Sequence, residues 1–471
     1  MILADISAWQ PAPGRILRWR PTAAARAAAD AAPVDPGLPS ILQADHLAAY
    51  ARVVRDSGRH RAWTGVATSI DGRLDREAMT RALHRFLRTH GGLRTWFDLS
   101  GATPVRHLVP ADRIEFEIVE DTVPEGDWAT ALPEYLTAAF DAECRPDSWP
   151  GFCFGVVEAA DSFGVFWGCD HAFTDGASQI MLPSELAAYY AAEVTGEDGP
   201  GLPTVDETGD FPSYAAEERT AAEAYTPESP EVAEWVRMIA ENGARLPRFP
   251  LPLGLGEGEK GQVVIRTMTL LDGEELAAFD RVCADAGARA TGGVFAAVAA
   301  TDQALAGKHT YFGVTVLGTR DRGPYARSQG WFCAFAPVEF EVASAQSFGE
   351  LAVRAQDALR KARKLAHTPV NLVLQSLVAR GVCTPEMLGS PQLLSYLDLR
   401  RFPGAGTPAD ARGVHFTGLG RTANASLWIN RDDERLYLLA QVPDNPVAAD
   451  SVERYHNELR DVLRASVAVG V

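Results

Sequence analysis

Two acidic residues and a histidine stand together in a short segment that could handle a proton. The segment reads Asp170-His171-Ala172-Phe173-Thr174-Asp175-Gly176. An unperturbed histidine titrates at about pH 6.5, so it can accept a proton at cellular pH. His171 is therefore suited to take a proton from an attacking amine or alcohol, an effect worth about 10²- to 10⁴-fold in rate. A lone histidine followed four residues later by aspartate is more often a histidine in a turn, so the surrounding elements must decide.

The residues on either side of this segment predict a strand before it and a helix after it. Residues 164–169 form an apolar run of strand length that leads directly into Asp170. A strand end followed by a loop is a common position for functional side chains, because the sheet fixes the main chain there. Thr174 or Asp175 is expected to cap the first amides of the following helix. The pattern thus presents His171 at the end of a rigid element.

The rest of the chain alternates strands and helices in two halves, which predicts an α/β fold in two lobes. The first forty residues, rich in Pro, Ala and Arg, are expected to form an extended arm anchored by Trp9 and Trp19. Polar stretches near 195–209 and 221–260 place the boundary, so we expect an N-terminal lobe over 1–215 with the arm and the motif, and a C-terminal lobe over 216–471. The predicted strands are 63–70, 93–97, 104–109, 114–119, 151–157, 262–270, 311–317, 334–342, 425–430 and 436–441, and the predicted helices are 40–57, 75–89, 128–140, 231–242, 273–286, 293–306, 348–365 and 448–466.

Composition and charge limit the possible functions. The chain of 471 residues carries 62 acidic and 44 basic side chains, a net charge of −18, which argues against nucleic-acid binding because that needs a basic face. An acidic protein could still dock on a local basic patch, since salt screens distant charges. No run approaches the roughly 18 apolar residues of a membrane span, and no signal peptide precedes the fold, so we expect a cytoplasmic protein. The six cysteines are scattered, without metal spacing, and are expected to be buried thiols.

Several segments along nearly the whole chain resemble, in the right order, the motifs of one family. Together with the DHxxxDG segment they make the chain similar to the condensation-domain and polyketide-associated acyltransferase superfamily, whose hallmark is HHxxxDG, and to its stand-alone actinobacterial branch. The matching segments are the arm with Trp9, Pro13-Gly14 and Trp19; Ser40–Leu47 (S-x-x-Q-x-x-x-L); Ile70–Asp75 (G-x-L-D); Thr89–Phe97 (R-H-E-x-L-R-T-x-F, departing at Thr89 and Gly91); Asp210–Ala215 (Y-x-D-Y-A); Gly313–Arg320 (G-x-P-x-x-G-R, with one extra residue); and Gly330–Val338 (G-x-F-x-N-x-x-P).

The resemblance implies two chloramphenicol-acetyltransferase-like lobes, each an α+β two-layer sandwich, arranged as a V with a tunnel between them. In the family the second histidine of HHxxxDG is the critical one, and that position is His171 here. The aspartate of the hallmark, here Asp175, is structural: it pairs with an arginine and shapes the loop together with Gly176. The best match for that arginine is Arg320, with Arg322 as the second choice.

The resemblance also implies the substrates. The donor would be an acyl thioester on phosphopantetheine, supplied by an acyl or peptidyl carrier protein or by coenzyme A, with no tightly bound cofactor and no metal. The acceptor would be a small-molecule amine or alcohol, so the product would be an amide or an ester in natural-product biosynthesis. No nucleic acid or membrane is expected as a partner, and the chain is expected to act as a monomer.

Asp170 departs from the family pattern, which has a histidine at this position. A carboxylate beside His171 could raise its pKa and fix its tautomer, or could point away into a main-chain contact. The departure also leaves an alternative function open, a non-catalytic condensation-like module that docks a tailoring enzyme. His171, Asp175 and Gly176 argue for the catalytic alternative, because a docking module would not need them.

Overall fold

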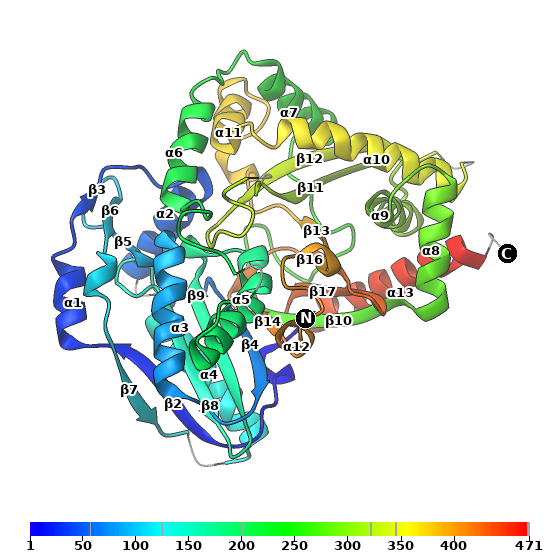
Figure 1. Ribbon diagram of the computed structural model, residues 1–471. Coiled ribbons are helices and arrows are strands. Elements are labelled where there is room, and N and C mark those ends of the chain that lie inside the picture. Colours follow the sequence, from blue (N-terminus) through cyan, green and yellow to red (C-terminus); the bar gives the residue numbers. More distant parts are fainter. Residues whose placement is uncertain (57, 124–125, 200–201, 321–322, 344–345, 469–471) are drawn as a thin grey trace. The chain divides into compact units, whose positions relative to one another are not determined.

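The protein consists of two units, each built on a large sheet. The structure is a computed structural model, and it describes the whole chain except residues 57, 124–125, 200–201, 321–322, 344–345 and 469–471 (Figure 1). The first unit comprises Met1–Thr220, Gly318–Cys333 and Arg401–Gly418, and the second comprises Ala221–Leu317, Ala334–Arg400 and Leu419–Val471. Both units mix helices and strands, so the predicted α/β class is confirmed.

The motif strand lies at the centre of the sheet of the first unit. Within the described residues the strand order is β1-β14-β4-β9-β8-β2-β7. β9 pairs antiparallel with β4 on one side and with β8 on the other, so the strand that leads into the motif is held along both edges. These strands are β1 (Ile2–Leu3), β14 (Val414–Thr417), β4 (Trp63–Asp71), β9 (Ser162–Asp170), β8 (Phe152–Glu158), β2 (Arg15–Pro21) and β7 (Phe116–Asp121), beside a small sheet of β3 (Val34–Asp35), β6 (Val105–Leu108) and β5 (Thr95–Asp98).

Helices cover β9 on both faces of this sheet. Trp167 packs edge-on against Phe86 of α3, which Figure 1 shows lying over the strands, whereas its neighbour Phe166 packs against Phe140 of α4 on the opposite face. Burial on both faces explains why the strand reads as a continuous apolar run rather than as an alternating one. The helices of this unit are α1 (Ala23–Asp30), α2 (Ile41–Arg55), α3 (Arg76–Thr89), α4 (Trp128–Glu143), α5 (Gly176–Thr195), α6 (Phe211–Ala222, ending just past the boundary) and α12 (Pro408–Ala411).

Gly168 of β9 lies directly against the Phe140 ring of α4. A Cβ atom added at Gly168 would overlap the ring of Phe140, which is fully buried. We expect Gly168→Ala to lower the free energy of unfolding by about 1–3 kcal/mol, because a well-packed ring cannot move aside without strain. Gly101→Ala is the control, since its Cβ would lie 3.8 Å from the nearest atom, the carbonyl oxygen of Thr103. Equal denaturation midpoints for the two variants would contradict this account of the packing.

The first forty residues do not form only an extended arm, so that prediction is wrong for most of them. Residues 15–21 are the strand β2, which pairs with both β7 and β8 inside the sheet, and residues 23–30 are helix α1 with Thr22 as its N-cap. Side chains on both sides of β2, including Ile16, Leu17 and Trp19, are buried. Their burial in the core outweighs the Pro- and Arg-rich composition that suggested an arm.

The division of the chain is not the single cut expected between residues 215 and 216. The first unit runs to Thr220 and also takes in 318–333 and 401–418 from the second half of the sequence. The physical reason is strand pairing, because β14 pairs with β4 and with β1 in the sheet of the first unit. A boundary placed by loop composition cannot show that a later segment returns to an earlier sheet.

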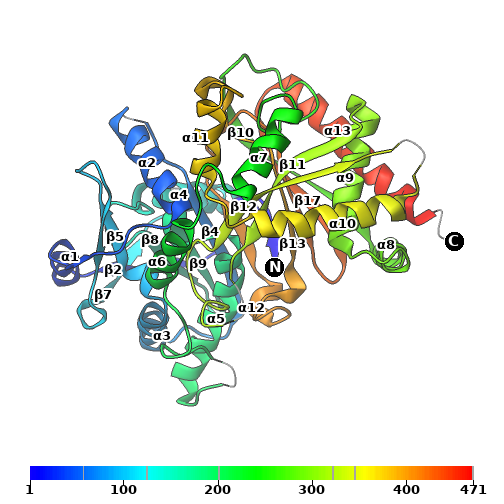
Figure 2. The same ribbon diagram turned by 90° about the horizontal axis from the view of Figure 1, so that it is seen from above.

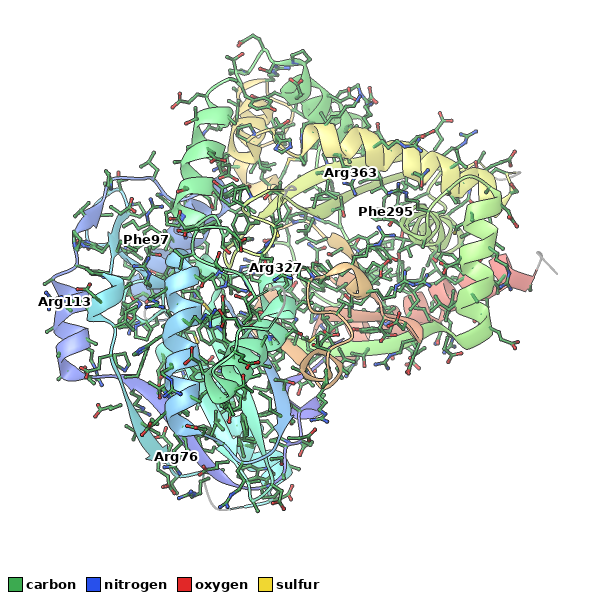
Figure 3. All side chains as sticks on the ribbon, in the orientation of Figure 1. Arg76, Phe97, Arg113, Phe295, Arg327 and Arg363 are labelled. Atoms are coloured by element: carbon green, nitrogen blue, oxygen red, sulfur yellow. The ribbon has the colours of Figure 1, made fainter. Side chains whose placement is uncertain are left out.

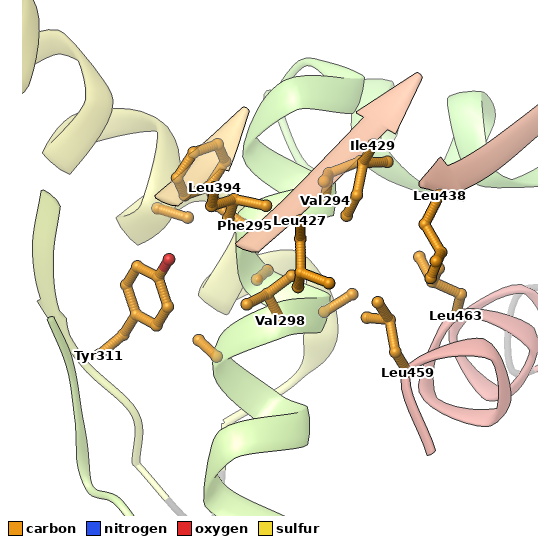
Figure 4. Packing of buried hydrophobic residues seen from close by; sticks show 14 of the residues in the cluster. Val294, Phe295, Val298, Tyr311, Leu394, Leu427, Ile429, Leu438, Leu459 and Leu463 are labelled. Atoms are coloured by element: carbon orange, nitrogen blue, oxygen red, sulfur yellow. The ribbon is translucent and has the colours of Figure 1, made fainter. Parts of the chain in front are cut away.

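The second unit is built on a sheet whose order in the described residues is β12-β11-β13-β16-β17-β10-β15. The helices α8, α9, α10 and α13 pack in its main core, and α7 and α11 form a second cluster with residues of β11, β12 and β13. Figure 2 shows α8, α9, α10 and α13 gathered on one side. Figure 4 shows the core beneath them, where Leu427 and Leu438 point from the strands toward Val298 of α9 and Leu459 of α13. The strands are β12 (Cys333–Glu341), β11 (Thr310–Gly318), β13 (Leu393–Asp398), β16 (Ser426–Arg431), β17 (Arg435–Pro443), β10 (Gly261–Asp272) and β15 (Arg421–Thr422), and the helices are α7 (Pro230–Glu241), α8 (Gly273–Asp285), α9 (Ala290–Ala306), α10 (Phe348–Leu365), α11 (Val370–Ala379) and α13 (Pro446–Ala468).

Apolar side chains fill the interior of each unit separately. Figure 3 shows Phe97 within the first unit and Phe295 within the second, and both are buried, whereas Arg113 projects at the periphery. The six cysteines are all free thiols, and five of them are buried, as expected. Among the described residues, no helix combines the length and the apolar character needed to cross a membrane.

Candidate active site

The motif loop is fixed by main-chain hydrogen bonds where β9 ends. The amide of Asp170 donates to the carbonyl oxygen of Gly151 at 2.9 Å, and the amide of His171 donates to that of Ala62 at 3.0 Å. His171 to Phe173 then form one turn of 3-10 helix, and α5 begins at Gly176. The predicted arrangement of strand, loop and helix is confirmed.

Asp175 holds this loop through three kinds of contact made by its carboxylate. As the N-cap of α5, it accepts a hydrogen bond from the amide of Ser178 at 2.7 Å. It also forms a bidentate pair with the guanidinium of Arg320, at 2.7 and 2.8 Å, and accepts the amide of Phe332 at 3.0 Å. Burial favours the neutral form of Asp175, but Arg320 and then Ser178 reverse this effect and lower the pKa of the carboxyl below its ordinary value.

Arg320 is the arginine that the family resemblance implied as the partner of Asp175, and further contacts hold its guanidinium in place. Its Nε donates to the carbonyl oxygen of Ser328 at 3.2 Å, and its guanidinium lies 4.5 Å from the centre of the Phe332 ring. It also contacts the hydroxyl of Ser178. The second choice, Arg322, lies outside the described residues. A Cβ atom added at Gly176 would meet no atom within 4 Å, so no described contact requires glycine there.

The ring of His171 lies against the ring of Trp331, and one of its two nitrogens is buried. Its centre lies 4.0 Å from that of Trp331, and its Nδ1 is buried without a hydrogen bond to a neighbouring residue. The residue as a whole is only partly buried, and Nε2, unlike Nδ1, is not a buried atom without a partner. The pKa of His171 is lowered by burial and then by the nearby His46, against the opposite influence of its own main-chain oxygen, Asp175 and Asp170. His171 is therefore kept as a free base, the form that accepts a proton.

Asp170 does not contact the imidazole of His171 by a hydrogen bond. Its two oxygens accept from Nε2 of His46 at 2.8 Å and from Nε2 of His60 at 2.9 Å, and Oδ1 also accepts the amide of Ala172 at 2.8 Å. Asp170 therefore makes the main-chain contact that was one of the two expectations. It makes no hydrogen bond to the ring of His171 that could fix the tautomer of this residue. Burial opposes ionisation of Asp170, but His46 and His60 lower its pKa well below the usual range.

His46 and His60 belong to the site, and neither was identified as a site residue from the sequence. A usable signal was present on α2, where Gln43, His46 and Tyr50 follow helical spacing and so lie on one face. Gln43 donates to the carbonyl oxygen of Ala172 at 2.7 Å, so this face lies against the motif loop. His60, by contrast, lies in an irregular segment where spacing predicts nothing.

The two histidines and Asp170 are also the residues that could hold a metal ion. Within the described part of the chain they form a group whose potential ligand atoms all lie within 4.8 Å of one another. Each imidazole meets a different carboxylate oxygen at a hydrogen-bond distance. Ligands of one tetrahedral zinc ion, with bonds of about 2.0–2.2 Å, would lie roughly 3.3–3.6 Å apart. The geometry therefore favours hydrogen bonds between these groups.

Comparisons with known proteins agree with this architecture. The family model of the Condensation domain matches residues 57–382. The chain is 32% identical over 467 residues to 2'-acyl-2-O-sulfo-trehalose (hydroxy)phthioceranyltransferase PapA1 of Mycobacterium tuberculosis (strain CDC 1551 / Oshkosh), covering 98% of this chain and 88% of that protein. It is 30% identical over 460 residues to Trehalose-2-sulfate acyltransferase PapA2 of Mycobacterium bovis (strain BCG / Pasteur 1173P2), covering 96% and 95%.

A solved structure supports the same relationship at the level of the fold. The structure of PapA2 acyl transferase matches with a TM-score of 0.87 and 28% identity, covering 99% of this chain and 100% of that one. The chain therefore belongs to the Condensation domain family, and it is an acyltransferase of the condensation type. The resemblance drawn from the sequence motifs is confirmed, while the V shape and its tunnel stay predictions.

Proposed function

We propose that this enzyme transfers an acyl group from a phosphopantetheine thioester to a hydroxyl or amine acceptor, with His171 as the base. The observation that carries the proposal is the state of His171, a partly accessible imidazole with a lowered pKa on a fixed loop. A histidine in this state is neutral at cellular pH and can accept a proton without first losing one. Asp175 and Arg320 have a structural role, because their contacts set the position of the loop, and Gly176 follows Asp175 as the first residue of α5.

In the proposed reaction, His171 takes up one proton and releases it again. Nε2 of His171 takes the proton of the acceptor as its oxygen or nitrogen attacks the thioester carbonyl carbon, so a new C–O or C–N bond forms. The tetrahedral intermediate then collapses and the C–S bond breaks. The departing thiolate receives the proton from His171, which returns to its neutral form. The products are an ester or amide and a free thiol.

A carbohydrate hydroxyl is the acceptor that we propose first. PapA1 and PapA2, to which this chain is similar along nearly its whole length, carry names that describe acylation of sulfated trehalose. The donor is coenzyme A or a carrier protein, and the product belongs to natural-product or lipid biosynthesis. We place the enzyme in the cytoplasm as a monomer. The docking-module alternative is disfavoured because these relatives are named as acyltransferases.

Mass spectrometry of product mixtures tests the proposal. The protein is incubated with one acyl chain presented on coenzyme A or on a carrier protein, and with trehalose 2-sulfate, trehalose or an amino acid as acceptor. We expect an acylated acceptor and an equal amount of free thiol for at least one pair. Thioester cleavage that yields only the free acid, at a rate independent of every acceptor, would contradict acyl transfer to an acceptor.

A further inference from the structure

A fully buried carboxylate at the motif is surrounded by two imidazoles. The side chain of Asp170 has no exposed surface, and those of His46 and His60 are 8% and 11% exposed. A buried carboxylate anion is costly unless a positive charge neutralises it. Among the described residues, the groups in contact with Asp170 that can carry such a charge are these two imidazoles.

Only one of the two rings adjoins the aromatic pair formed by His171 and Trp331. The centre of the His46 ring lies 5.5 Å from that of Trp331 and 6.3 Å from that of His171. His60 instead packs edge-on against Tyr50 at 4.7 Å. His46 thus connects the buried carboxylate with the surroundings of His171, whereas His60 lies on the side of Tyr50.

We propose that Asp170 and His46 form a positioning pair for His171, in which the carboxylate holds the imidazole of His46 against Trp331 and the potential of this ring keeps His171 as the free base. The hallmark of the family has a histidine where this chain has Asp170. Here helix α2 brings an imidazole to that end of the motif instead. The catalytic meaning of the pair rests on the proposed function, but its electrostatic effect does not.

The groups around His171 support a pKa of His171 below its ordinary value. Burial and the positive potential of His46 lower its pKa, while Asp170 and Asp175 act in the opposite sense. From β14, His415 faces the same region, and its pKa is lowered to about 4 by burial and by His171, so it is neutral near pH 7. Two cations near the motif are paired with carboxylates, Arg320 with Asp175 and Arg61, which precedes Ala62, with Asp141. His46 is therefore the residue whose removal is expected to change the potential at His171 most directly.

A chemical titration tests the pair without any substrate. Diethyl pyrocarbonate reacts with neutral imidazole, so the extent of modification of His171, read by peptide mass spectrometry over a pH series, gives its midpoint. The variants are His46→Gln and His60→Gln, each of which removes one imidazole from Asp170. We expect His46→Gln to raise the midpoint of His171 by about one to two pH units, which is the range given by unit charges at this separation in a medium of dielectric constant about 20 to 40. His60→Gln should leave the midpoint in place.

Two further measurements separate this effect from a loss of structure. His46→Phe keeps a ring against Trp331 but cannot carry a charge, so it should raise the midpoint as His46→Gln does, even if the glutamine variant folds poorly. In the enzyme assay, the acid limb of the profile of kcat/KM against pH should shift to higher pH for both His46 variants. The reason is that a higher pKa of His171 leaves less of its free base at low pH. Activity should therefore fall more at pH 6 than at pH 8.

The outcomes distinguish the inference from the proposed function. An unchanged or lowered midpoint in both His46 variants, or equal shifts in His46→Gln and His60→Gln, would overturn the positioning pair even if acyl transfer is found. A midpoint that shifts as expected in a protein without acyl transfer would support the pair and contradict the proposed function. One equivalent of zinc in the purified protein, lost in His60→Gln, would show that the three residues bind a metal and would also overturn the pair.

Discussion

Replacement of His171 by alanine is expected to lower the rate of acyl transfer by about 10²- to 10⁴-fold while the protein remains folded. The variant removes the group that accepts the proton of the acceptor, and it leaves the hydrogen bond between the amide of residue 171 and Ala62 in place, because that bond uses only the main chain. The measurement is the initial rate of product formation by mass spectrometry, with circular dichroism to confirm the fold.

A matched control shows whether the loss of rate is specific to the imidazole of His171. His309→Ala removes an exposed histidine of the second unit, and it should leave the rate unchanged. Normal turnover by His171→Ala would remove this residue from the mechanism. A variant that loses activity together with its circular dichroism signal would assign His171 a structural role instead.

Replacement of Asp175 by alanine is expected to lower the free energy of unfolding by roughly 3–5 kcal/mol, because it leaves a largely buried arginine without its partner. The side chains of Asp175 and Arg320 are 1% and 9% exposed, so water cannot replace the lost contact efficiently. The variant also removes the cap of α5 and the acceptor for the amide of Phe332. Chemical denaturation followed by tryptophan fluorescence measures the loss.

A double variant shows whether the unpaired charge is the cause. Asp175→Ala combined with Arg320→Met should recover part of the lost stability, since it removes the stranded guanidinium as well. Asp71→Asn, which breaks an exposed pair with Arg412, should change the stability little. If Asp175→Ala proved as stable as the parent chain, the buried pair would not hold the loop.

The strand and helix that flank the motif could be predicted because their signals are local. The apolar run before Asp170 and the capping aspartate at 175 lie within a few residues of the elements they define, and both are in place. The pairing of Asp175 with Arg320, 145 residues apart in sequence, came from the family resemblance and not from any local signal. The N-terminal strand β2 was missed because its Pro- and Arg-rich surroundings outweighed its few apolar residues.

The environment of Asp170 was beyond the reach of sequence spacing. Its partners, His46 and His60, are 124 and 110 residues away, and one of them follows no periodic pattern. The helical spacing of Gln43 and His46 on α2 indicated a shared face, but only the folded chain shows that this face meets the motif loop. The same holds for Trp331, whose ring lies against His171 although the two are 160 residues apart.

The return of β14 to the sheet of the first unit determines when that unit can be completed during translation. The edge of β4 that β14 covers, from Thr64 to Ala67, has no sheet partner until the ribosome has passed residue 417. A fragment that ends at residue 220 would carry this exposed edge permanently, together with an unpaired Asp175. Exposed edges of this kind promote association between chains, so the nascent first unit depends on the rest of the chain arriving promptly.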